Sequence, residues 1–202
     1  MAHSVLDDAH AARLSDDRDG ALRTATAILD ADPAQLAAAL LLAELAIEGD
    51  RPFVAGEVAA RLVDAFTRRG DLPRAVAAAK VAGAGGESEG PLLAKAAKAF
   101  GKGSARLADV APTPPPLPAS VAIPPTLASA RGDGLLDAAE AALQRYLATD
   151  DGAPADAQVP VLPLFAELAP GPLAQLLEGM TLRALGSDEA LIEEDAEGTL
   201  VW

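Results

Sequence analysis

Two histidines and one segment with the spacing of a calcium loop are the candidates for metal binding in this chain. The sequence has two histidines, His3 and His10, which are seven residues apart and would share one face of a helix. Chain ends are often poorly ordered, and no carboxylate stands in a clear ligand register with both imidazoles, so we expect solvated side chains. Residues 15–26 have the spacing of a calcium loop, but Thr26 stands where such a loop has its bidentate glutamate. The sequence therefore predicts no metal site.

Phosphate-binding loops and catalytic groups are equally scarce. Residues 101–104, Gly-Lys-Gly-Ser, resemble the last residues of a phosphate-binding loop. However, Ala96 stands where such a loop has its first glycine, and the segment follows a predicted helix. Residues 83–90, GAGGESEG, lack the third glycine and the preceding strand of a dinucleotide loop. No set of side chains can be assigned the roles of acid, base and nucleophile. We therefore expect a protein that is not an enzyme and that uses no cofactor.

Charge and composition narrow the classes further. The 202 residues carry 16 Lys and Arg against 30 Asp and Glu, a net charge of −14, with −3 over residues 1–109 and −11 over residues 110–202. Neither part has the basic surface that nucleic-acid binding requires, so we expect no DNA or RNA partner. The apolar stretch 36–47 is shorter than the roughly 20 residues of a membrane span. Without cysteine or a signal-like start, the sequence predicts a soluble cytoplasmic protein.

Alanine dominates the first half of the chain and predicts closely packed helices. Half of all residues are apolar while aromatic residues make up 3%, so the core is expected to consist of small side chains. Alanine favours helix, and Gly, Pro and Asp interrupt the Ala-Leu runs at short intervals. Short breaks favour antiparallel packing of consecutive helices. We predict helices over residues 5–14, 18–30, 33–48, 53–69, 73–82 and 91–100.

One stretch of this half has the pattern of a repeated helix pair. Small and aliphatic residues recur along two helices that a break at Asp32-Pro33 separates: Gly20, Ala21, Ala25, Leu29, Ala38, Leu42 and Ala46. The stretch resembles the tetratricopeptide repeat, and a looser copy begins at Gly70-Asp71. The resemblance implies that residues 1–108 form an array of antiparallel helix pairs whose open surface binds peptides or helices of other proteins. An irregular helical bundle is the alternative interpretation.

A proline-rich linker, an amphipathic helix and an acidic linker follow the helical domain. Prolines between residues 112 and 125 favour extended polyproline II, so residues 109–132 are predicted to be a spacer; the alternative is a ligand for an SH3-like or WW-like groove. Residues 149–158 are predicted to be the second linker. Between them, Asp133 is expected to cap a helix over residues 133–148. Its apolar face must dock on another surface, and it consists of Leu136, Ala139, Leu143 and Leu147.

The last segment, residues 159–202, changes in character. Its pattern predicts a helix over residues 170–178 and strands over residues 181–185, 190–192 and 199–202. The segment resembles the opening of the cyclic nucleotide-binding domain family, which implies a partial α+β, β-roll-like fold. The matched residues are LPLF at 162–165, Leu168, Pro170, Leu173, Leu176, Leu177, Glu189, Leu191, Ile192, Glu194, Gly198 and Leu200.

The same segment departs from that family at several positions. Asp188 and Asp195 replace turn glycines, and Ala196 replaces an aspartate. The phosphate-binding cassette of the family is not reached by Trp202, so no ligand residue is carried over and the binding residues are unknown. Six carboxylates between residues 188 and 197 would also repel a phosphate. A cyclic nucleotide is therefore expected only as the ligand of a longer form of the protein.

Together these features predict a mainly α protein with a TPR-like helix-pair array, a Pro-rich linker and a partial α+β segment. The predicted function is a non-enzymatic protein-interaction adaptor or regulator of bacterial signalling type, with other proteins bound by the array. The alternative is a cyclic-nucleotide sensor whose ligand site is completed beyond Trp202. A hydrolase or transferase with an unrecognised site is a third hypothesis.

Overall fold

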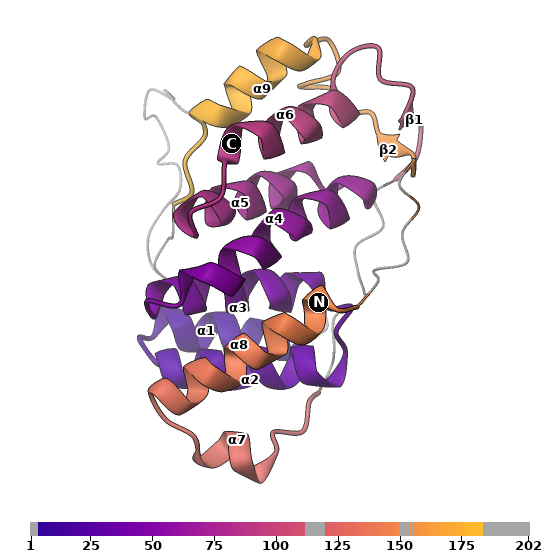
Figure 1. Ribbon diagram of the computed structural model, residues 1–202. Coiled ribbons are helices and arrows are strands. Elements are labelled where there is room, and N and C mark those ends of the chain that lie inside the picture. Colours follow the sequence, from indigo (N-terminus) through magenta and orange to yellow (C-terminus); the bar gives the residue numbers. More distant parts are fainter. Residues whose placement is uncertain (1–3, 112–119, 150–153, 155, 184–202) are drawn as a thin grey trace, which may run out of the picture.

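The protein is mainly helical, as predicted. The computed structural model describes residues 4–111, 120–149, 154 and 156–183 (Figure 1). In chain order these residues form α1 (Val5–Leu14), α2 (Arg18–Ala31), α3 (Leu36–Glu48), α4 (Pro52–Arg68), α5 (Leu72–Ala84), α6 (Glu89–Phe100), β1 (Leu107–Ala108), α7 (Pro125–Ser129), α8 (Asp133–Leu147), β2 (Val159–Pro160) and α9 (Pro170–Gly179).

Helices α1 to α6 form a helical array in which each helix packs on the next one along the chain. Connections of three or four residues separate them, so consecutive helices must run back on each other. Four of these connections contain a residue with a positive φ: Asp16 at 63°, Asp50 at 60°, Gly70 at 76° and Gly86 at 96°. Aspartate and glycine tolerate this conformation better than other residues, which explains why the breaks predicted from the sequence contain them.

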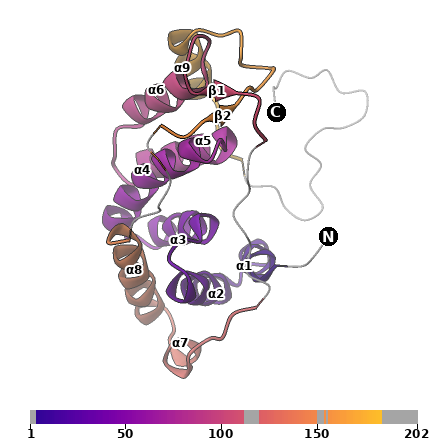
Figure 2. The ribbon, with the colours of Figure 1, turned by 90° about the vertical axis from the view of Figure 1, so that its right-hand side faces the viewer.

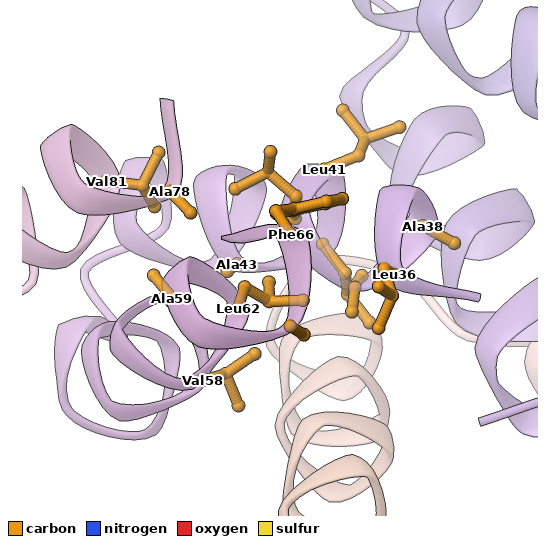
Figure 3. Packing of buried hydrophobic residues seen from close by; sticks show 14 of the residues in the cluster. Leu36, Ala38, Leu41, Ala43, Val58, Ala59, Leu62, Phe66, Ala78 and Val81 are labelled. Carbon is orange, nitrogen blue, oxygen red and sulfur yellow. The ribbon is translucent and has the colours of Figure 1, made fainter. Parts of the chain in front are cut away.

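Small side chains bring the helices of the array close together. Alanines on α3, α4 and α5 are buried between the larger side chains of Leu36, Leu41, Leu62 and Phe66 (Figure 3). Helices α4 and α5 approach each other closely where a Cβ atom on Gly56 would lie 2.9 Å from the carbonyl oxygen of the C-cap residue Gly85. The backbones of the two helices are therefore in direct contact at this point.

The chain beyond the array returns to pack on it at two places. Helix α8 lies across α2, α3 and α4, and α9 packs on α6 at the opposite end of the molecule (Figures 1 and 2). The short strands β1 and β2 pair in parallel, with Leu107 opposite Val159 and Ala108 opposite Pro160. The segment that carries α7 and α8 thus leaves the array at β1 and comes back beside its starting point at β2.

Several predicted boundaries differ from the structure. Helix α3 begins at Leu36 and not at Pro33, because Asp32 accepts hydrogen bonds from the backbone of Ala34 (3.0 Å) and the side chain of Gln35 (2.7 Å) and so holds a turn. Helix α6 begins at Glu89, two residues before the predicted start.

Predictions for the segments between the array and α9 also differ from the structure. The N-cap of α8 is Gly132, at φ 50°, with no side-chain hydrogen bond, so the predicted cap at Asp133 is wrong. The five-residue helix α7 was not predicted; it begins at Pro125, a residue that fits the first turn of a helix. Residues 181–183 are not in a strand, and the strands predicted at 190–192 and 199–202 lie outside the described residues.

Candidate helix-binding face

The array holds an amphipathic helix on one of its faces. Helix α8 packs on α2, α3 and α4, and we call the surface that it covers the α8-binding face. The side of α8 that meets this surface is buried and consists of Leu135, Leu136, Ala139, Ala142, Leu143 and Tyr146. Spacings of three, four and seven residues place these side chains on one stripe of the helix.

The predicted apolar face of α8 is largely confirmed but slightly rotated. Leu136, Ala139 and Leu143 are buried as expected, whereas Leu147 is only half-buried. The true stripe also includes Leu135, Ala142 and Tyr146, which fall one position to the N-terminal side of the predicted residues. Alanine occurs on several sides of this helix, so the sequence of α8 defines the width of the buried stripe poorly. The run Ala142-Leu143 followed by Tyr146 was the signal that could have located the stripe.

Arg61 of α4 binds the C-terminal end of α8. Its guanidinium donates hydrogen bonds to the carbonyl oxygens of Leu147 and Thr149 and lies 5.5 Å from the centroid of the Tyr146 ring. The last carbonyls of a helix have no partner within the helix and carry the negative end of its dipole. One cation therefore satisfies the end of α8 and packs on its single aromatic side chain.

Two ion pairs join the outer edges of α8 to the array. Nη2 of Arg51, the N-cap residue of α4, lies 3.1 Å from Oδ1 of Asp137. Asp30 near the end of α2 pairs with Arg145. The Asp137 side chain is 68% exposed and that of Arg145 is 53% exposed, so solvent screens both pairs. Exposed pairs of this kind contribute little to binding energy but fix the direction in which the helix lies.

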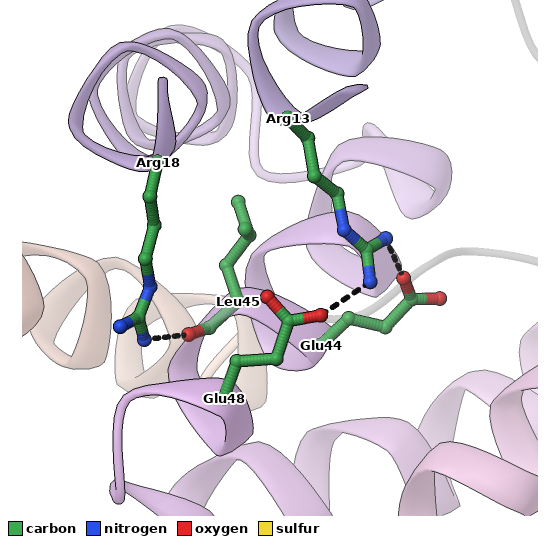
Figure 4. Close-up of polar contacts among 5 residues, drawn as sticks. All are labelled: Arg13, Arg18, Glu44, Leu45 and Glu48. Carbon is green, nitrogen blue, oxygen red and sulfur yellow. Dashed lines mark hydrogen bonds and ion pairs between the residues drawn. The ribbon is translucent and has the colours of Figure 1, made fainter. Parts of the chain in front are cut away.

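Leu136, in the first turn of α8, enters a notch next to a glycine. A Cβ atom added to Gly49, the C-cap residue of α3, would lie 2.6 Å from Cδ2 of Leu136. Arg18 fills the other side of the notch and donates a hydrogen bond of 2.9 Å to the carbonyl oxygen of Leu45, in the last turn of α3 (Figure 4). The absence of a side chain at Gly49 is therefore what admits Leu136.

Cations of the array bind the ends of the two other later helices in the same way. Arg23 of α2 donates hydrogen bonds of 3.3 Å to the carbonyl oxygens of Leu127 and Ala130 at the end of α7. Lys80 of α5 donates a bond of 2.8 Å to the carbonyl oxygen of Glu178 in the last turn of α9. The array thus supplies a basic group to the C-terminus of each of α7, α8 and α9.

Helices α1, α3 and α5, together with Leu182 and Arg183 after α9, line a groove on another face of the array. In it, Arg13 of α1 pairs with both Glu44 and Glu48 of α3 (Figure 4). The groove has a volume of about 400 Å³. His10 on the same helix has a lowered pKa, because neighbouring protein atoms displace water and so disfavour its charged form. This effect is larger than the opposing effect of the negative charge of Glu44. These charges are paired within the array and make an ion-pair network between α1 and α3.

An apolar cavity of about 250 Å³ lies between α5 and the segment around α9. Its walls include Leu72, Val76, Phe165, Leu177 and Met180. No charged group except Lys80 lines it, and Lys80 is already bound to Glu89 and to the end of α9. Among the described residues, the lining of this cavity is thus almost entirely apolar and comes from α5, from residues 164–165 and from the end of α9 with the residues after it.

The residues first considered for metal or phosphate chemistry have structural roles. Asp17 caps α2 by accepting a hydrogen bond of 2.8 Å from the backbone of Gly20. Lys102 follows the end of α6 and donates a bond of 2.8 Å to Glu167, which lowers the pKa of that exposed carboxyl group. His3 lies outside the described residues. No group of three or more His, Asp or Glu side chains in the described part of the chain is arranged to hold a metal ion.

Comparison with protein-family models, with curated proteins and with solved structures gives no match for this chain. The tetratricopeptide and cyclic nucleotide-binding resemblances therefore remain hypotheses about its ancestry. Among the described residues, no helix has both the length and the hydrophobicity needed to cross a bilayer. The geometry of the α8-binding face is therefore what indicates a function for this chain.

Proposed function

We propose that this protein is a non-enzymatic adaptor or regulator whose helical array binds amphipathic helices of partner proteins. One observation carries the proposal: the array already holds an amphipathic helix on α2, α3 and α4. That surface supplies what an external helix would need, namely an apolar contact area, a notch for a leucine, and a cation for the last carbonyl groups. Helix-in-groove recognition uses the same combination of apolar anchors at helical spacing.

The charges around the α8-binding face support an oriented partner helix. Arg51 at one end favours an acidic residue in the first turns, whereas Asp30 at the other end favours a basic residue in the last turns. A helix that carried these residues would dock with its C-terminus toward Arg61. The proposal also places the protein in the cytoplasm of a bacterial cell, for which its cysteine-free sequence is suited.

Crosslinking and affinity capture with the full chain tests this proposal. Gly49→Trp fills the notch that admits Leu136 and closes the α8-binding face to any helix. Gly171→Trp is the matched control, since a Cβ atom on Gly171 meets nothing within 4 Å. We expect captured proteins to crosslink to α2, α3 or α4 through a helical segment, and to be lost with Gly49→Trp but retained with Gly171→Trp. Capture that is equally strong with both variants would contradict the proposal.

A further inference from the structure

Helix α8 is connected to the array in a way that lets it leave without opening the fold. The segment from Asp109 to Gln158 begins directly after β1 and ends directly before β2. The β1–β2 pair holds the two ends of the segment together, with a hydrogen bond of 2.8 Å from the backbone of Val159 to the carbonyl oxygen of Arg106. Arg106 also donates a bond of 2.8 Å from Nε to the carbonyl oxygen of Ala157. Removal of α8 would therefore leave β1, β2 and the contact of α9 with α6 in place.

The contacts that hold α8 are suited to reversible binding. Two of the six residues in its buried stripe are alanines, and both of its ion pairs are partly exposed. Its N-terminus begins at Gly132, which has a positive φ and provides no side-chain cap. A helix with an uncapped start depends on packing against its neighbour for its stability. Outside the α8-binding face, this segment is expected to lose its helical structure.

We propose that α8 is a built-in competitor for the α8-binding face, and that a partner helix enters only when α8 has left. The partner is an amphipathic helix with the pattern of α8 itself: a leucine for the Gly49 notch, an acidic residue one position later, small residues three and six positions after the leucine, and a basic residue near its C-terminus. This inference rests on the proposed function, because it specifies which helices the array binds and how their access is controlled.

The connection to the array gives α8 a strong advantage over a free helix. The linkers on both sides keep α8 close to its binding surface, and short tethers give effective concentrations in the millimolar range. A free helix of equal intrinsic affinity would therefore bind the intact chain far more weakly than a chain whose own α8 cannot dock. The ratio of these two affinities measures the competition directly.

The probe for this experiment is a fluorescein-labelled synthetic peptide of residues 131–149, titrated with the full chain while its fluorescence anisotropy is measured. The open variant carries Leu135→Asp and Leu143→Asp, two substitutions within α8 that leave the array unchanged. We expect the open variant to bind the peptide at least tenfold more tightly than the unsubstituted chain does. Addition of Gly49→Trp to the open variant should abolish binding, and a peptide with Leu143→Asp should bind neither chain.

The possible results separate this inference from the proposed function. Equal peptide affinity for the open variant and the unsubstituted chain would overturn the competition but leave helix binding by the array intact. No binding to an open variant that keeps its helical circular dichroism would overturn both for this face, and the crosslinking experiment would then show whether partners bind elsewhere. If the double variant does not fold, the milder Leu143→Ala replaces it and should bind the peptide more tightly than the unsubstituted chain does, whereas equal affinity would overturn the competition.

Discussion

The contact between Gly56 and Gly85 offers a quantitative test of how the array is packed. In Gly85→Ala, the new Cβ atom would clash first with Cα of Gly56, and it would lie 2.9 Å from the backbone nitrogen of Gly56 and 3.2 Å from the carbonyl oxygen of Pro52. These neighbours are backbone atoms of α4, so none of them can turn aside as the end of a side chain can. Overpacking of this kind costs about 1 to 3 kcal/mol, and the smaller freedom of alanine in the unfolded chain offsets about 0.4 to 1 kcal/mol of it.

The net effect is a loss of about 1 to 2 kcal/mol in the free energy of unfolding, or a fall of about 2 to 8 °C in Tm for a chain of this length. Thermal unfolding followed by circular dichroism measures it. Gly171→Ala in α9 is the control, since its Cβ atom meets nothing within 4 Å and should leave Tm unchanged or slightly higher. A Gly85→Ala protein that melts at or above the Tm of the unsubstituted chain would refute the close approach of α4 and α5.

Three further predictions concern other contacts. Ala46→Phe at a fully buried position of α3 should lower the free energy of unfolding by about 1 to 3 kcal/mol in urea titrations, and an unchanged midpoint would show that the site is loosely packed. Arg61→Ala leaves the last carbonyl groups of α8 without their cation and should destabilise the docked helix by about 1 to 3 kcal/mol, read from the same titrations. The NMR titration of His10 should give a pKa below its ordinary value of 6.5. As the pH falls, the His10 imidazole of the unfolded chain is therefore protonated before that of the folded chain. The free energy of unfolding should then decrease as the pH drops below about 6.5.

Local sequence signals predicted the array well because they act within one helix or one turn. Alanine and leucine favour helix over most of residues 5–100, and Asp50 and Gly70 stand at turns that need a left-handed residue. The predicted bounds of α1, Val5–Leu14, are those of the structure, and those of α4 differ by one residue at each end. At Pro33 the prediction failed, because the side chain of Asp32 holds a turn that competes with the start of a helix.

Long-range contacts could not be predicted in the same way. The amphipathic pattern of α8 showed that the helix must dock, but its binding surface is made by Gly49, Arg61 and Asp30, which lie on three other helices. The residues next to each of them in the sequence do not mark it as part of a binding surface. The pairing of Leu107 with Val159 was missed for a related reason, since strands of two residues give no periodic signal.

In the proposed competition, α8 is a separate, reversibly bound element on a stable array. Native-state hydrogen exchange tests it most directly, because it measures the free energy of opening for each helix in the unmodified chain. We predict that the amides of α8 exchange through an opening of lower free energy than those of α3 and α4, and that Arg61→Ala lowers this value for α8 alone. Exchange of α8, α3 and α4 as one cooperative unit, with a common free energy in both proteins, would contradict the claim.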